Sequence, residues 1–189
     1  FRLRPDGKRV QIVVEMQHAN GPKTMEIVAA NYRDIGIELL PRIIDRTQWD
    51  ANRDNNNFQM QWYPFDRLSV VAADPRIMMG NDSYAHQYYL WYSTKGTSGI
   101  ESPADHPIRR VFTDWDKASK ASNREQADTA LNDLIKTFVT QGWVIGVVGE
   151  SPALSIVKTD FKNFPDDLIE DDITRGIGLG ATQQMWMKK

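Results

Sequence analysis

The 189-residue chain is long enough for one domain of good size, or for one and a half small ones. Its 23 basic and 25 acidic residues are well mixed and give a net charge of −2. This argues against nucleic-acid grooves and anionic-membrane binders, because both need a basic face. The lack of cysteine excludes disulfides, thiolate zinc sites and cysteine nucleophiles.

The first third of the chain predicts alternating strands and helices. Apolar residues recur at helical spacing before Gly36, which is suited to end a helix, and Thr47 is a possible N-cap of the next one. The expected elements are a strand at 8–16, a helix at 22–35, a strand at 37–44, a short helix at 45–56 and a strand at 57–66. This order, with short connections, predicts an α/β fold whose mixed, largely parallel sheet has flanking helices.

The third expected strand ends in aromatic residues and an acid. In open α/β sheets, ligands collect beyond the carboxyl ends of the strands, where Trp62 and Tyr63 offer flat faces with a polar handle. Asp66 could pair with a ligand ammonium or guanidinium group, and Arg67 with a ligand carboxylate. The alternative is that Trp62 fills the core, Asp66 caps a turn and Arg67 is simply exposed.

The rest of the chain is mostly helical by its pattern. Trp91 belongs to an aromatic-rich helix and either lines a cleft or packs beneath the loop that follows. Asn123 and Gly142 are suited to begin and end the clearest helix of the chain. The expected elements are helices at 84–93, 108–121 and 123–142 and strands at 143–149 and 154–159.

No constellation of residues predicts catalysis, a metal site or a cofactor. His18, His86 and His106 lie far apart and have no ligand partner at helical spacing. The glycines at 176–180 do not sit between a strand and a helix, and Ser151 lacks the flanking glycines of a nucleophile turn. We therefore expect no catalytic residue, no cofactor and no enzyme.

Three stretches together resemble the family 5 extracellular solute-binding proteins, the periplasmic receptors of oligopeptide-type ABC importers. They are "MEIVAANYRDIGIELLPRIIDRTQWDANRDNNNFQMQWYPFD" (25–66), "PIRRVFTDWDKASKASNREQADTALNDLIKTFVTQGWVIGVVGESP" (107–152) and "ALSIVKTDFKNFPDDL" (153–168). Their order and spacing match the family over nearly the whole chain. One departure is the strand that reads Asn57-Phe58-Gln59-Met60, where the family usually has Asp-Phe-Asp-Met.

The resemblance implies a bilobal receptor that closes on its ligand, with a periplasmic binding protein-like II fold. Residues 1–149 would form most of the second lobe, and residues 150–189 would return to the first lobe. The chain would then be the C-terminal part of a longer protein, lacking the signal segment, in agreement with its opening on Phe1 rather than methionine.

The implied function is the capture of a small solute, such as an oligopeptide, opine or oligosaccharide, for delivery to ABC permease subunits. The protein would be periplasmic or extracellular, associated with the membrane through the importer, and would bind no nucleic acid. The expected ligand-binding side chains are those of Trp62, Tyr63, Asp66, Arg67 and Trp91. Two alternatives stay open: a non-catalytic α/β protein-interaction domain, and a hydrolase built from scattered Asp, His and Ser residues.

Overall fold

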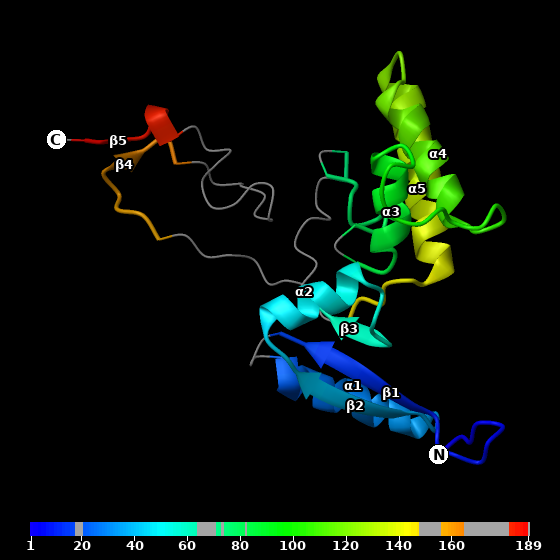
Figure 1. Cartoon of the computed structure of the whole chain (residues 1–189). Coiled ribbons are helices and arrows are strands. Elements are labelled where there is room, and N and C mark those ends of the chain that lie inside the picture. Colours follow the sequence, from blue (N-terminus) through cyan, green and yellow to red (C-terminus); the bar gives the residue numbers. More distant parts are fainter. Residues whose placement is uncertain are drawn as a thin grey trace. The chain divides into compact units, whose positions relative to one another are not determined.

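The computed structural model describes residues 1–17, 21–63, 71–72, 74–81, 83–147, 156–164 and 182–188 (Figure 1). The chain divides into two compact units. The first unit comprises Phe1–Pro64 and Arg76–Val147, and the second comprises Phe65–Pro75 and Val148–Lys189. The predicted assignment of 1–149 and 150–189 to two lobes of a receptor stays a prediction.

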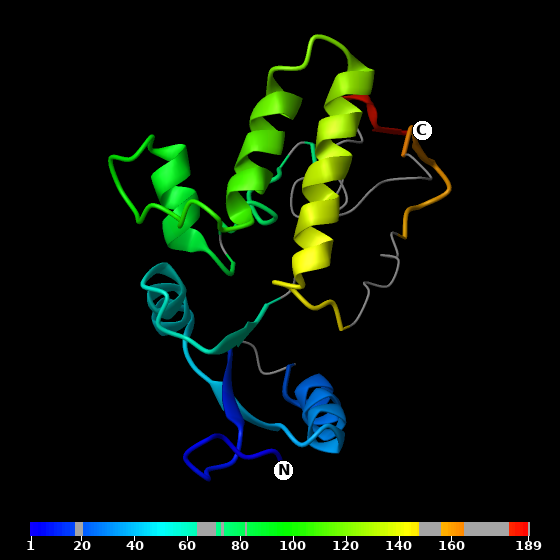
Figure 2. The same ribbon diagram turned by 90° about the vertical axis from the view of Figure 1, so that its right-hand side faces the viewer.

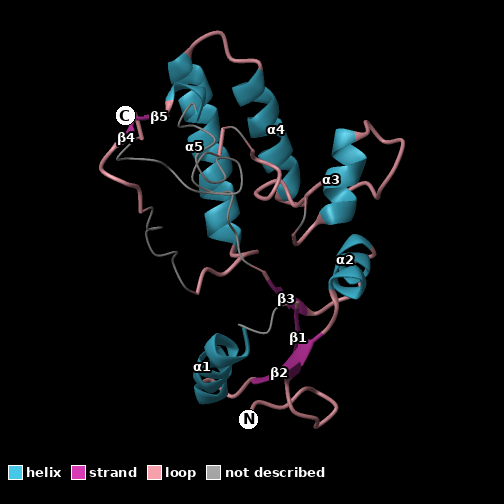
Figure 3. Ribbon diagram, turned by 90° about the vertical axis from the view of Figure 1, so that its left-hand side faces the viewer, coloured by secondary structure: helices cyan, strands magenta, loops and turns pink. Residues whose placement is uncertain are grey.

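The first unit contains a parallel sheet of three strands in the order β2-β1-β3 (Figure 3). The strands are β1 (Gln11–Met16), β2 (Glu38–Ile43) and β3 (Met60–Trp62). At the carboxyl end of β1, Met16 is in register with Ile43 on one side and with Trp62 on the other. The predicted parallel α/β sheet is confirmed, although β3 is shorter than the stretch expected from its alternation.

Helix α1 (Gly21–Asp34) and helix α2 (Arg46–Asp54) lie on opposite faces of this sheet (Figures 2 and 3). Side chains alternate between the faces of a strand, so Val14 and Met16 point to one face and Glu15 to the other. The face with Val14 and Met16 packs against Met25 of α1 in a core that also includes Leu39. The other face of the sheet meets α2, as described below.

The helices begin and end at capping residues and glycines, some of which the sequence indicated. Gly36 ends the α1 turn with a φ of 83°, as expected from its lack of a Cβ. Asp45, and not the expected Thr47, is the N-cap of α2, because its carboxylate accepts a hydrogen bond from the Gln48 backbone N–H at 3.0 Å. Asn123 caps α5 in the same way, and Gly142 ends it in the left-handed conformation.

Helices α3 (His86–Ser93), α4 (Ile108–Ser119) and α5 (Arg124–Gln141) follow. Helices α4 and α5 form an antiparallel hairpin (Figures 1 and 2). Its buried apolar residues recur at helical spacing and are Ile108, Val111, Phe112, Ala130, Leu134 and Phe138. Stacking of Tyr84 on Trp143, with ring centroids 4.7 Å apart, joins the segment before α3 to the segment after α5.

The second unit contains β4 (Phe161–Lys162) paired antiparallel with β5 (Trp186–Met187), and the 3-10 helix η2 (Thr182–Gln184). The strands expected at 143–149 and 154–159 are absent where these ranges are described, at 143–147 and 156–159. Their apolar residues suit a strand by composition, but a strand also needs a neighbour for its backbone groups. Ile145 and Ile156 are exposed to 64% and 86% instead.

Candidate functional site

The carboxyl ends of the three parallel strands define the candidate site. Because Met16, Ile43 and Trp62 are in register, the residues that follow them lie at one edge of the sheet. Gln17 follows β1, Arg46 begins α2 shortly after β2, and Tyr63 follows β3. We call Gln17, Arg46, Trp49, Asp50 and Tyr63 the edge cluster.

Arg46 is at the centre of the edge cluster. Its Nε donates to Asp50 Oδ2 at 2.7 Å, one helical turn later, and its Nη1 donates to Gln17 Oε1 at 3.2 Å. Its guanidinium carbon lies 5.6 Å from the centroid of the Tyr63 ring. The hydrogen bond to Asp50 raises the pKa of Arg46 above its ordinary value, so the guanidinium stays charged at any physiological pH.

Trp49 is the buried part of the edge cluster. Its side chain is 1% exposed, and its ring stacks on Tyr63 with centroids 5.1 Å apart and an interplanar angle of 28°. The guanidinium carbon of Arg53 lies 5.5 Å from the centroid of the Trp49 ring, so the indole is close to a guanidinium as well as to an aromatic ring. Trp49 thereby fixes the Tyr63 ring at the edge of the sheet.

A buried polar layer holds α2 in place over the sheet. Glu15, which is 6% exposed, accepts hydrogen bonds from Asn52 Nδ2 at 2.8 Å and from Gln61 Nε2 at 3.1 Å. Gln48 Nε2 donates to Asn52 Oδ1 at 2.7 Å. Both oxygens of the Glu15 carboxylate are therefore satisfied by side chains from α2 and β3, which ties both elements to the central strand.

The structure describes three of the five predicted ligand-binding residues. Trp62 is half-buried and packs against the core on the α1 face, whereas the half-buried Tyr63 belongs to the edge cluster. Asp66 and Arg67 lie outside the described residues. The two aromatics at the end of β3 thus point to different surroundings, and the ligand contacts of all five residues stay predictions.

Trp91 lies on α3, where it packs against the loop that leads to α4. Arg109 lies 5.8 Å from its ring centroid while donating to the backbone carbonyl of Pro103 and to Glu101. A Cβ added to Gly96 would lie 3.4 Å from the indole nitrogen. Of the two interpretations left open by the sequence, these contacts favour packing beneath the loop.

Sequence reasoning missed Arg46 and Gln17. Both stand close to the end of a predicted strand, as Trp62 and Tyr63 do, and Arg46 precedes Asp50 at the spacing of an ion pair on a helix. That combination of a strand end and an i,i+4 pair was a usable signal. A charged residue at a helix start is commonly solvated, so this signal by itself does not indicate a site.

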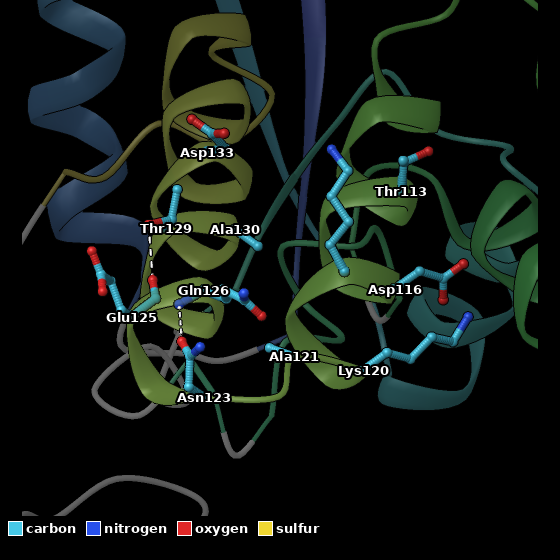
Figure 4. Close-up of a pocket in the computed structure, with 11 residues that line it drawn as sticks. Thr113, Asp116, Lys120, Ala121, Asn123, Glu125, Gln126, Thr129, Ala130 and Asp133 are labelled. Atoms are coloured by element: carbon cyan, nitrogen blue, oxygen red, sulfur yellow. Dashed lines mark hydrogen bonds between the residues drawn. The ribbon is translucent and has the colours of Figure 1, made fainter.

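A groove lies between α4 and α5, beside the turn that joins the two helices. Its volume is about 960 Å³, and Lys120, Asn123, Glu125, Gln126 and Asp133 are among its lining residues (Figure 4). Thr129 donates to the Glu125 carbonyl, and the Gln126 backbone donates to Asn123. Several of its polar groups are thus engaged within the helix, and the groove is separate from the edge cluster.

Two further properties concern the described part of the chain only. No group of three or more histidine, aspartate or glutamate residues there is arranged to hold a metal ion. No helix there combines the length and the apolar character needed to cross a bilayer.

No protein family model matches the chain, and no curated protein sequence matches it. Several solved structures, in contrast, match the chain. The oligopeptide-binding protein OppA matches with 19% identity and a TM-score of 0.72, covering 100% of this chain and 32% of that protein. The periplasmic binding protein MelB from Agrobacterium fabrum C58, solved with stachyose, matches with 14% identity and a TM-score of 0.57, covering 76% and 21%.

NikA from Brucella suis, solved with Fe(III)-EDTA, matches with 14% identity and a TM-score of 0.50, covering 70% of this chain and 25% of that protein. The chain thus spans about a third of the length of OppA and a quarter or less of the other two. At these identities the similarity concerns the fold. The fold of the chain is similar to that of the matched part of the oligopeptide-binding protein OppA, in agreement with what its sequence resemblance implied.

Proposed function

We propose that this chain is part of a solute-binding receptor of an ABC importer, without catalytic activity of its own. The observation that carries this proposal is the edge cluster: polar and aromatic side chains gather at the carboxyl edge of a parallel sheet. In open α/β sheets this edge is where ligands bind, and the chain has the fold of periplasmic binding proteins.

In the proposed mechanism, the chain supplies one wall of a cleft between two lobes. A solute that contacts both lobes only in the closed state shifts the equilibrium from open to closed, since its affinity for the two states differs. The closed receptor then presents the solute to permease subunits in the membrane. This assignment places the protein in the periplasm or outside the cell.

Tyr63 is the residue that we place first in the cleft wall, because Arg46 and Trp49 hold its ring at the edge of the sheet. Trp62, Asp66, Arg67 and Trp91 follow as predicted contacts, among which Trp62 and Trp91 also have packing partners within the chain. A residue with two such roles is expected to affect both stability and binding when it is replaced.

The solute class is open to peptides, oligosaccharides, opines and metal chelates. The names of the similar structures support this range: one is an oligopeptide-binding protein, one is in complex with stachyose and one with Fe(III)-EDTA. The edge cluster offers both a guanidinium and aromatic surface, which suits a polar solute rather than a purely apolar one.

The test is thermal unfolding of the full-length protein in the presence of each solute class, followed by calorimetry for any class that raises the unfolding temperature. A ligand that binds only the folded state stabilises it by mass action, and about 2.7 kcal/mol is expected at 100 times Kd. Tyr63→Ala should reduce this shift. If no class raises the unfolding temperature, the receptor function fails and the protein-interaction alternative gains support.

A further inference from the structure

Strand β2 has a free outer side. It stands at the end of the strand order β2-β1-β3, so it pairs with β1 on its inner side only. Among the described residues, none forms a backbone hydrogen bond with the outer side of β2. The unpaired N–H and C=O groups of such a side are a template on which another strand can add.

The hydrogen bonds to β1 show which backbone groups of β2 face outward. The N–H groups of Glu38 and of Ile44, just beyond the strand, donate to carbonyls of the chain segment that holds β1, at 3.0 and 2.9 Å. In a parallel pair, every second residue of a strand turns its backbone groups toward the same neighbour. The even-numbered residues of β2 therefore face β1, and the odd-numbered residues face outward. The outward residues are Leu39, Pro41 and Ile43.

Pro41 is the middle one of the outward residues, and it has no N–H. The outer side of β2 thus keeps donors only toward its two ends, and the proline ring occupies the place of the missing hydrogen. No hydrogen bond to β1 is lost, because the backbone of Pro41 faces away from β1. This is why a proline is tolerated within this strand.

The missing donor matters most for pairing between two copies of the chain. Two identical strand sides meet around a two-fold axis when the strands run antiparallel. An axis at the middle of β2 would place residue 41 opposite residue 41 of the other copy, where facing residues exchange both of their hydrogen bonds. Proline removes both bonds. A shift by two residues would place Pro41 opposite Leu39 or Ile43, and each such pair would lose one bond.

The side chains of β2 would otherwise favour self-pairing. Leu40 is 38% exposed and Ile43 is 57% exposed. Residues 37–44 read IELLPRII, a run of apolar residues that favour strands and that only Glu38, Pro41 and Arg42 interrupt. Apolar runs of this kind on the outermost strand of a sheet promote association unless a proline or a charge breaks them.

We propose that Pro41 keeps β2 the last strand of the sheet by preventing it from pairing with β2 of a second copy of the chain. This role of Pro41 is independent of the edge cluster and of the proposed receptor function.

The test is sedimentation velocity of the full-length protein over a range of protein concentrations, comparing the wild type with Pro41→Thr. Threonine restores the outward N–H and favours strands. Self-association of Pro41→Thr is expected to be about tenfold or more stronger than that of the wild type, the factor expected for two restored hydrogen bonds. Pro41→Ala restores the same donor without a strand-favouring side chain and should associate in the same direction.

Two controls separate the missing donor from the mere loss of a proline. Pro103→Thr makes the same replacement at an exposed proline outside the sheet and should sediment as the wild type does. Adding Ile43→Pro to Pro41→Thr removes another outward donor while leaving the hydrogen bonds to β1 intact, so it should return the protein to wild-type behaviour.

Hydrogen exchange locates the contact. The amides of Leu39 and Ile43 should exchange more slowly in associated Pro41→Thr than in the wild type, because their outward N–H groups become bonded. The proposed role is overturned if both Pro41 variants associate within twofold of the wild type, or if Pro103→Thr associates as strongly as they do. It is equally overturned if Ile43→Pro does not reverse the association, or if association leaves these two amides unprotected, as aggregation of unfolded chains would.

Discussion

The substitution Asn52→Ala tests whether the buried polar layer holds α2 on the sheet. Asn52 Nδ2 donates to the 6%-exposed Glu15 at 2.8 Å, and a hydrogen bond to a charged group contributes about 1.5–3 kcal/mol. The contact from Gln48 to Asn52 is lost as well. Alanine regains about 0.5 kcal/mol through its higher helix propensity. The expected net loss is about 2 kcal/mol of the free energy of unfolding.

Urea unfolding of the chain, followed by tryptophan fluorescence, measures this loss. With a slope of about 2 kcal/mol per molar urea, the midpoint should fall by about 1 M. The buried Trp49 on the same helix makes the signal sensitive to release of α2. The matched control is Asn132→Ala, an exposed position within α5, which should be neutral or slightly stabilising.

A second substitution separates charge from packing. In a Glu15→Gln background the unpaired group is uncharged, so Asn52→Ala should cost clearly less than it does beside the carboxylate. The reasoning is refuted if Asn52→Ala shifts the midpoint no more than Asn132→Ala does. It is also refuted if the cost is the same in both backgrounds.

Three further predictions concern other parts of the first unit. Burial and a hydrogen bond to a carboxylate of α4 raise the pKa of Tyr92 above its ordinary value. The contribution of Tyr92 to stability is therefore complete below about pH 10 and is lost as the pH rises further. The urea midpoint should be lower at about pH 11 than at about pH 9, and this difference should be smaller for Tyr92→Phe. Asp45→Ala should lower the free energy of unfolding by about 1 kcal/mol through loss of the α2 cap, while Thr47→Ala changes it by less than about 0.5 kcal/mol. Gly99→Ala should destabilise more than Gly7→Ala in the same assay: both have positive φ, but only at Gly99 would the new Cβ collide with a backbone carbonyl at the start of α3.

Periodicity predicted most of the first unit because each element there has a local signature. Val14 and Met16 alternate along β1, and Leu134 and Phe138 recur at helical spacing along α5. The expected strand at 143–149 had equally suitable residues, yet 143–147 do not form one. A strand requires a partner for its hydrogen bonds, and the sequence of a segment does not record whether that partner is present.

The sequence indicated where a candidate site would lie, but not most of the residues that form it. The rule that ligands collect at the carboxyl ends of parallel strands pointed to residues 62–66, of which Tyr63 belongs to the edge cluster. It did not point to Arg46, whose position depends on Gln17 from another strand end. Contacts between residues 29 positions apart arise from the register of the sheet, and a single sequence does not specify that register.

Glu15 shows why the second face of the sheet escaped the sequence. Between Val14 and Met16 it reads as the solvated position of a half-buried strand. In a parallel sheet, however, both faces are covered, so a polar residue on the second face must be satisfied from within. Glu15 is satisfied by α2 and β3. Because the same α2 carries Arg46 at its first residue, the buried carboxylate also fixes where the guanidinium meets Tyr63. Loss of the Asn52 contact should therefore loosen the edge cluster as well as the fold, although no atom of Asn52 belongs to it.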